Sequence, residues 1–255
     1  MALLEVRNLT KYFGGLAAVN NLSFEVNEKE ILGLIGPNGA GKSTLFNLIT
    51  SYYKPSKGII IFNGKNITNL KTHQIAQLGI VRTFQKTNVF MDMSVSKNIN
   101  IAHHLKCKTS DWEKFIFNSK ARKEEQEIIR NTDEIMESIG LLPYKSEQAK
   151  NLPHGLLRLL EIGIALAVEP KLILLDEPFT GMNPNETNKV IETVKSIQQK
   201  KGYTIILVEH NMPVVMEISD RIIVMNFGNK IAEERPIEIL KNQKVIEAYI
   251  GKDTE

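Results

Sequence analysis

Residues 36–44 read GPNGAGKST and match the pattern G-x-x-x-x-G-K-[ST] at every fixed position. The apolar run at 31–35 that precedes them predicts a strand, and the composition of 42–49 predicts a helix. Between a strand and a helix, glycines let backbone N–H groups surround a phosphate, and the helix N-terminus adds a favourable dipole. The motif therefore predicts an α/β fold that binds a nucleotide.

Two side chains of this phosphate loop suit the charge of a nucleotide. Lys42 would place a cation near the β- and γ-phosphates, and the Ser43 hydroxyl can ligate Mg²⁺. The pattern by itself does not distinguish between the classes of phosphate-loop protein. The candidate nucleotide-binding residues of the loop are Gly36, Pro37, Asn38, Gly39, Ala40, Gly41, Lys42, Ser43 and Thr44.

A second apolar run, at 172–175, ends in two carboxylates, Asp176 and Glu177. Asp176 at the end of a strand can hold Mg²⁺ directly or through water. Glu177 beside it could polarise an attacking water as a general base. Two acidic residues after a strand are often only a solvated loop, but together with the phosphate loop they predict nucleotide hydrolysis.

Two further polar residues follow predicted strands. His210 comes just after the run at 204–208, and the carboxyl ends of strands are where α/β proteins bind ligands. A single histidine at such a place is more often structural than catalytic. Gln85 directly follows the run at 80–84, and by itself a glutamine there would indicate no function.

The order of the predicted elements indicates an insertion in an α/β core. Strands are predicted at 3–6, 22–26, 31–35, 59–62 and 80–84, and again at 172–175, 204–208 and 222–225. Between them, strand signals are absent from about 86 to 160, and 120–139 is a charged segment with apolar residues at helical spacing. One or two short helices are expected at 236–250.

Charge and cysteine content exclude several classes of protein. Among 255 residues, 32 Lys and Arg oppose 29 Asp and Glu, a net charge of +3 that argues against a nucleic-acid binder. Cys107 is the only cysteine, which rules out an internal disulfide and suggests a reducing compartment. No signal peptide is recognisable, and no apolar run approaches the ~20 residues that span a bilayer. We therefore expect a cytoplasmic protein.

Taken together, these motifs resemble the ATP-binding subunit of an ABC transporter, over essentially the whole chain. The phosphate loop corresponds to the family's Walker A motif and Asp176-Glu177-Pro178 to its Walker B motif, with Gln85 and His210 in the family's order and spacing. The resemblance implies ATP and Mg²⁺ as cofactors. It also implies catalytic roles for Glu177, His210 and Gln85, and metal-binding roles for Ser43, Gln85 and Asp176.

The resemblance extends to the adenine site. Phe13, in Lys11-Tyr12-Phe13-Gly14-Gly15, matches the aromatic residue that stacks on adenine, and Tyr12 is the competing choice. Val19 is a further candidate for nucleotide contact.

Within the family, the chain is most similar to the larger ATP-binding subunit of branched-chain amino acid importers, on four passages: 13–21, 79–85, 181–187 and 208–222. The implied fold is an α/β P-loop NTPase (RecA-like) mixed-sheet core with an antiparallel β subdomain and an inserted helical subdomain. The expected domains are 1–85 with 165–235, the insertion at 86–164 and a helical tail at 236–255. An ABC transporter for urea, another amino acid or a lipid, and a soluble ABC ATPase, are the alternatives.

One motif departs from the family. Its signature, Leu-Ser-Gly-Gly-Gln, is replaced by LPHGL at 152–156, so the serine hydroxyl and the glutamine amide are missing. His154 and Gly155 could still donate hydrogen bonds to a nucleotide. In the segment typical of the family's D-loop, Asn183 replaces the usual aspartate.

The resemblance also implies partners. They are a second ATP-binding subunit in a head-to-tail dimer, for which we expect a paralogous chain, two membrane permease subunits and, indirectly, an extracytoplasmic substrate-binding protein. No nucleic acid is expected, and the chain would be peripheral on the cytoplasmic face of the membrane. Val89, Phe90, Met91 and Met93 are candidates for the permease contact, or they pack inside the helical subdomain.

Overall fold

The computed structural model describes residues 2–83, 89–103 and 119–250. The chain divides into two compact units. The first unit comprises Met1–Arg82, Lys171–Pro178 and Gln198–Glu255, and the second comprises Thr83–Pro170 and Phe179–Ile197. The sequence predicts an insertion at 86–164, whereas the second unit begins at Thr83, continues to Pro170 and also contains Phe179–Ile197.

The larger sheet of the first unit has six strands in the order β10-β9-β3-β8-β7-β6. All neighbours from β9 to β6 are parallel, and β10 pairs with β9 in the antiparallel sense. Every residue of β3, β7 and β8 is buried, which explains why these strands read as continuous apolar runs. The strands are β3 (Ile31–Ile35), β6 (Ile80–Arg82), β7 (Leu172–Asp176), β8 (Thr204–Val208), β9 (Arg221–Asn226) and β10 (Asn229–Glu234).

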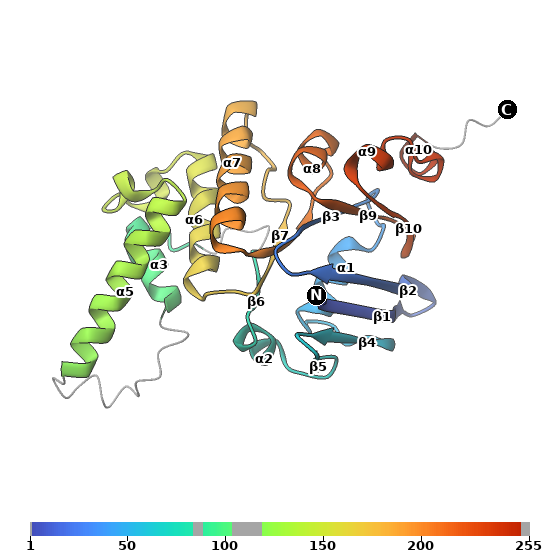
Figure 1. Ribbon diagram of the computed structural model, residues 1–255, viewed down its shortest axis with the longest axis horizontal. Helices are drawn as coiled ribbons and strands as arrows, with labels where there is room; N and C mark the ends of the chain where they lie inside the picture. The colour runs from blue at the N-terminus through green and yellow to red at the C-terminus, as the bar shows by residue number, and fades with distance from the viewer. Residues whose placement is uncertain (1, 84–88, 104–118, 251–255) are drawn as a thin grey trace. The chain divides into compact units, whose positions relative to one another are not determined.

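A four-stranded antiparallel sheet forms the other layer of the first unit, in the order β2-β1-β4-β5. Its strands are β1 (Ala2–Phe13) and β2 (Leu16–Asn27), dark blue in Figure 1, and β4 (Lys57–Phe62) and β5 (Lys65–Asn66), drawn in teal. Helix α1 (Lys42–Ile49) shares one apolar core with both sheets, through buried residues such as Leu45 and Phe46. The start of α1, and with it the phosphate loop, is thereby fixed between the two sheets.

Short helices complete the first unit. They are α2 (Thr72–Gln77), α8 (Met212–Ile218), α9 (Pro236–Ile239) and α10 (Gln243–Ile250). A second apolar cluster joins α8, α9 and α10 to the sheet through Val215, Ile239, Val245 and Ile35. The helices expected at 236–250 are thus present as α9 and α10.

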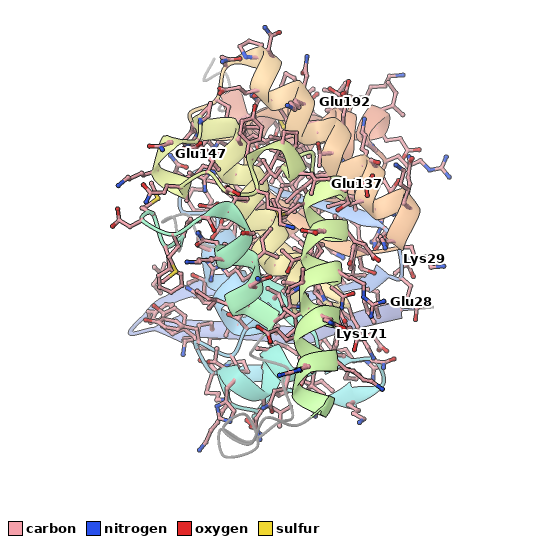
Figure 2. All side chains as sticks on the ribbon, turned by 90° about the vertical axis from the view of Figure 1, so that its left-hand side faces the viewer. Glu28, Lys29, Glu137, Glu147, Lys171 and Glu192 are labelled. Carbon is pink, nitrogen blue, oxygen red and sulfur yellow. The ribbon has the colours of Figure 1, made fainter. Side chains whose placement is uncertain are left out.

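The described helices of the second unit are α3 (Val95–His103), α5 (Ser119–Ser138), α6 (His154–Ala167) and α7 (Pro184–Lys201), with 3₁₀ turns at Leu142–Tyr144 and Ala149–Asn151. The last residues of α7, from Gln198, belong to the first unit. Gly163 lets α6 approach its neighbours closely, because a Cβ there would lie 2.6 Å from the Ile139 Cδ1 atom. The charged face of this unit is exposed, as Figure 2 shows for Glu137 on α5 and Glu192 on α7. Among the described helices, none is long and apolar enough to cross a membrane.

Candidate nucleotide-binding site

The phosphate loop leaves β3 with a backbone that only glycine adopts readily. Gly36 has φ +151°, and a Cβ at this position would lie 2.1 Å from the Met225 carbonyl oxygen of β9. Gly41 has φ +101°, and its Cβ would lie 2.2 Å from the Ala18 carbonyl oxygen of β2. Gly39 has φ +80° but no atom within 4 Å of a built Cβ. The two outer glycines are therefore required by close packing, and the middle one by conformation alone.

Lys42 is buried, and its ammonium group is held by the loop itself. Nζ donates to the Gly36 carbonyl at 2.6 Å and to the Pro37 carbonyl at 3.1 Å. Burial lowers the pKa of Lys42 below its ordinary value, while the charges of Glu177 and Asp176 act in the opposite direction. A nucleotide phosphate would supply the negative charge that this partly desolvated cation favours.

The remaining loop residues leave the N-terminus of α1 open to a ligand. Asn38, Gly39 and Ser43 are exposed, and Thr44 is half-buried. Gly41 precedes α1, and no side chain in the described part of the chain caps the helix there. Backbone N–H groups at such an end are ready donors to an anion.

Asp176 is buried at the end of β7 and already has a cationic partner. The Arg82 Nη2 atom of β6 donates to Asp176 Oδ2 at 2.6 Å, and Nη1 donates to Asn47 Oδ1 at 2.6 Å. The guanidinium also lies over the Phe46 ring, with 5.5 Å from Cζ to the centroid. Sequence reasoning missed Arg82, although a cation within an otherwise apolar strand could have signalled it.

Glu177 has an unusual backbone conformation. Its φ is +49°, in the left-handed region that a residue with a side chain rarely adopts, and its N–H donates to the Val208 carbonyl at 2.9 Å. Such a conformation costs about 1–3 kcal/mol and is often found at functional sites. The Glu177 carboxylate lies 3.9 Å from His210 Nδ1, beyond hydrogen-bond distance. The first unit thus brings together Lys42, Asp176, Glu177 and His210.

The aromatic candidates lie at the end of β1. Phe13 and Tyr12 are equally exposed, at 42% each. Of the two, Phe13 is the one with a ring contact among the described residues: it lies edge-on to Tyr53 with 5.2 Å between the ring centroids, and Lys11 Nζ is 5.1 Å from the Phe13 centroid. Val19 is fully buried in the core of the first unit, and its contact with a nucleotide remains a prediction.

We expect Phe13→Ala to weaken ATP binding and Tyr12→Ala to leave it nearly unchanged. Base stacking on an aromatic side chain is worth about 1–3 kcal/mol in single-stranded nucleic-acid sites, which sets an upper guide. Titration of each variant with a fluorescent ATP analogue measures the dissociation constants. Weaker binding by the Tyr12 variant alone would transfer the stacking role to Tyr12.

The altered signature lies in the second unit, at the start of α6. His154 is exposed and lies beside Gly181, since a Cβ on that glycine would be 3.4 Å from His154 Cε1. Gly155 packs against Glu186 of α7, with 3.1 Å between its built Cβ and the Glu186 Cβ. Glu186 and Asn183 exchange hydrogen bonds at the start of α7. The signature and D-loop segments are therefore packed together within this unit, whereas Gln85 lies outside the described residues.

The C-terminal helix also reaches the phosphate loop, which the sequence did not indicate. Burial raises the pKa of Tyr249 on α10, and a hydrogen bond from the backbone of Gly36 opposes this rise. Val245 of the same helix packs in one cluster with Ile35, the residue before Gly36.

The chain is similar to known proteins over almost its whole length. The chain is 42% identical over 250 residues to the high-affinity branched-chain amino acid transport ATP-binding protein LivG of Salmonella typhimurium, covering 98% of both chains. It is 38% identical to BraF, of the same description, from Pseudomonas aeruginosa, again with 98% of both covered. The crystal structure of an ABC transporter's ATP-binding cassette in its ADP conformation matches with TM-score 0.85 and 34% identity, over 99% of this chain and 100% of that one.

A nucleotide-free ATP-binding cassette from an ABC transporter matches almost as well, with TM-score 0.84 and 34% identity over 99% of this chain and 100% of that one. These similarities agree with the expected fold, a mixed-sheet core with an antiparallel sheet and helices. The family model described as ABC transporter matches residues 19–180, which include the phosphate loop, Asp176 and Glu177. The chain therefore belongs to the ABC transporter family, as an ATP-binding and ATP-hydrolysing cassette.

Proposed function

We propose that this chain is the ATPase subunit of an ABC importer for branched-chain amino acids, peripheral on the cytoplasmic face of the membrane. The observation that carries the proposal is full-length similarity to relatives of that name, 38% to 42% identical, in a chain that places Lys42, Asp176 and Glu177 in one compact unit. Transport of urea, another amino acid or a lipid would use the same cassette, and a soluble ABC ATPase is the less favoured alternative.

The donor set at the phosphate loop fits Mg²⁺. Ser43 is an exposed hydroxyl in the first turn of α1, and Asp176 is a carboxylate at the end of β7, so both offer the oxygen ligands that this ion prefers. Gln85 would add an amide oxygen. Bound there with ATP, Mg²⁺ neutralises charge on the phosphate oxygens.

The residues of the chain would divide the remaining work. Lys42 binds the β- and γ-phosphates, and the backbone N–H groups of the loop and of α1 hold the phosphate oxygens in place. Glu177 accepts the proton of a water whose oxygen forms a bond to the γ-phosphorus, while the bond from that phosphorus to the bridging oxygen breaks. His210, 3.9 Å from Glu177, would orient the water or the γ-phosphate.

For the permease contact we propose the apolar residues that follow 84–88. Phe90, Met91 and Met93 are 53%, 40% and 38% exposed, whereas Val89 is buried. This exposure supports a docking role for the first three and an internal packing role for Val89.

Co-expression with two permease subunits and a second ATP-binding subunit tests the proposal. We expect the chain to purify in one complex with them and to hydrolyse ATP faster when the amino-acid-loaded binding protein is added. A soluble ABC ATPase would purify without membrane subunits. If urea or an unrelated amino acid stimulates ATP hydrolysis and leucine, isoleucine and valine do not, the proposed substrate is wrong.

The altered signature supports a paralogous partner and two unequal ATP sites. A signature serves the nucleotide held by the partner, but Pro153 has neither a hydroxyl nor an N–H, and Leu156 has no amide. We expect the site with this chain's Glu177 and the partner's signature to carry most of the turnover.

Changing the Walker B glutamate to Gln in one subunit at a time measures this inequality. Glu177→Gln should remove most steady-state hydrolysis by the complex, and the same change in the partner should leave a clear fraction. Equal losses would contradict the proposal and make Pro153 and Leu156 tolerated variation.

A further inference from the structure

Arg82, in the first unit, contacts both the helix that follows the phosphate loop and the strand that ends at Asp176. It is the last residue of β6, which runs parallel to β7 with Arg82 opposite Leu174, so its side chain reaches the end of β7 where Asp176 lies. Its other guanidinium arm binds Asn47, on the same helix that begins at Lys42. One cation therefore links α1 to Asp176.

This ion pair is shielded from water. The side chains of Arg82 and Asp176 are 12% and 5% exposed, and the Phe46 ring covers part of the guanidinium. A shielded pair attracts far more strongly than a surface pair, and removing one partner leaves an uncompensated buried charge. The Asp176 carboxylate is thus neutralised by the protein before any divalent cation arrives.

We propose that Arg82 is the resident counter-ion of Asp176 and that it sets the Mg²⁺ requirement of the nucleotide site. Mg²⁺ draws on the same carboxylate, and the guanidinium repels a second positive charge nearby. Arg82 keeps Asp176 in place without the metal and raises the Mg²⁺ concentration at which the site fills. The inference rests on the proposed role of Asp176 as a Mg²⁺ ligand.

The test is a Mg²⁺ titration of nucleotide binding by the isolated full-length chain. A fluorescent, non-hydrolysable ATP analogue is bound in EDTA, and MgCl₂ is then added to measure the half-saturating free Mg²⁺ concentration. Arg82→Met, a neutral side chain of similar length, should lower this concentration by about tenfold, because a like charge a few ångströms away is removed. Arg82→Gln should also lower the half-saturating Mg²⁺ concentration, and it replaces Arg82→Met in the test if the Met variant does not fold.

Two controls separate charge from packing. Arg82→Lys keeps a cation beside Asp176 but cannot reproduce both arms of the guanidinium, so its half-saturation should stay nearer to the parental value than that of Arg82→Met. Asn47→Ala removes the hydrogen bond from Arg82 Nη1 and keeps the ion pair with Asp176, and its half-saturation should remain within about twofold of the parental value. An effect of Asn47→Ala equal to that of Arg82→Met would show that Arg82 acts through packing, which overturns the proposal.

Unfolding in urea, without Mg²⁺ or nucleotide, gives a second readout. Arg82→Met should lower the midpoint, and adding Asp176→Asn to it should recover most of the loss, because the buried charge then disappears. No recovery would mean that Arg82 stabilises the fold independently of Asp176, against the proposal.

The outcomes also separate this inference from the proposed function. If the parental chain responds to Mg²⁺ and Arg82→Met responds at the same or a higher concentration, the counter-ion proposal is wrong and the metal site stands. If Asp176→Asn responds to Mg²⁺ at the parental concentration, or if neither chain responds, Asp176 is not a metal ligand; its proposed role and the counter-ion proposal are then both wrong, while the importer function, which rests on similarity, is untouched.

Discussion

Glu177→Gln is expected to reduce steady-state ATP hydrolysis by about 10²–10⁴-fold at this chain's site while ATP binding is retained. The amide keeps the size and the polar end of the glutamate but no longer accepts a proton from the attacking water. Lys42 and the loop backbone still hold the phosphates, so the dissociation constant should change little. Hydrolysis is measured in the assembled transporter, and binding with a fluorescent ATP analogue.

Glu169→Gln is a matched control for this change. Glu169 is an exposed glutamate with φ +47°, close to the φ of +49° at Glu177, and it follows α6 outside the phosphate site. The control variant should hydrolyse ATP at the parental rate within about twofold, because Glu169 is exposed and lies outside the phosphate site. Parental hydrolysis by Glu177→Gln would contradict its role as general base.

Gly41→Ala is expected to destabilise the chain strongly. The added Cβ would lie 2.2 Å from the Ala18 carbonyl oxygen, which belongs to the backbone of β2 and cannot move aside as a side chain would. The positive φ alone costs about 1–3 kcal/mol, and the clash adds to it, so we expect a loss of about 3 kcal/mol or more. Urea unfolding of the purified protein measures the loss.

Gly39→Ala, two residues earlier in the same loop, separates strain from clash. Its φ is +80°, but no atom lies within 4 Å of a built Cβ. This variant should therefore lose only about 1–2 kcal/mol, the cost of a left-handed backbone for an L-residue. Equal losses from the two variants would mean that β2 does not restrain the loop.

The buried parallel strands were the most predictable part of the fold. The runs at 31–35 and 204–208 coincide with β3 and β8 at both ends, because burial on both faces makes every residue apolar. Strand β10 was not predicted, since its sequence, NKIAEE, is polar and only Ala232 is buried. An edge strand keeps polar residues where no neighbour covers it, and its sequence then resembles a loop.

The parts of the candidate site that consist of consecutive residues could be predicted from the sequence, and the contacts between distant segments could not. The phosphate loop and the pair Asp176–Glu177 are each contained in a few consecutive residues, so their pattern is visible in the sequence. Arg82 and Asp176 are 94 positions apart, and no pattern in either segment indicates that the two residues pair. The contact of Tyr249 with Gly36 is likewise created by the packing of α10 and not by any motif.

The left-handed backbone at Glu177 has a consequence for the evolution and engineering of this protein. A glycine or asparagine at this position would relieve the strain, so random variation screened for thermal resistance alone should favour its replacement. Such a variant would gain stability and lose the carboxylate for which we propose the role of general base. The strained backbone at Glu177 thus lowers stability at a residue that we propose is needed for turnover. A screen for thermostable variants must therefore also select for growth on the transported nutrient.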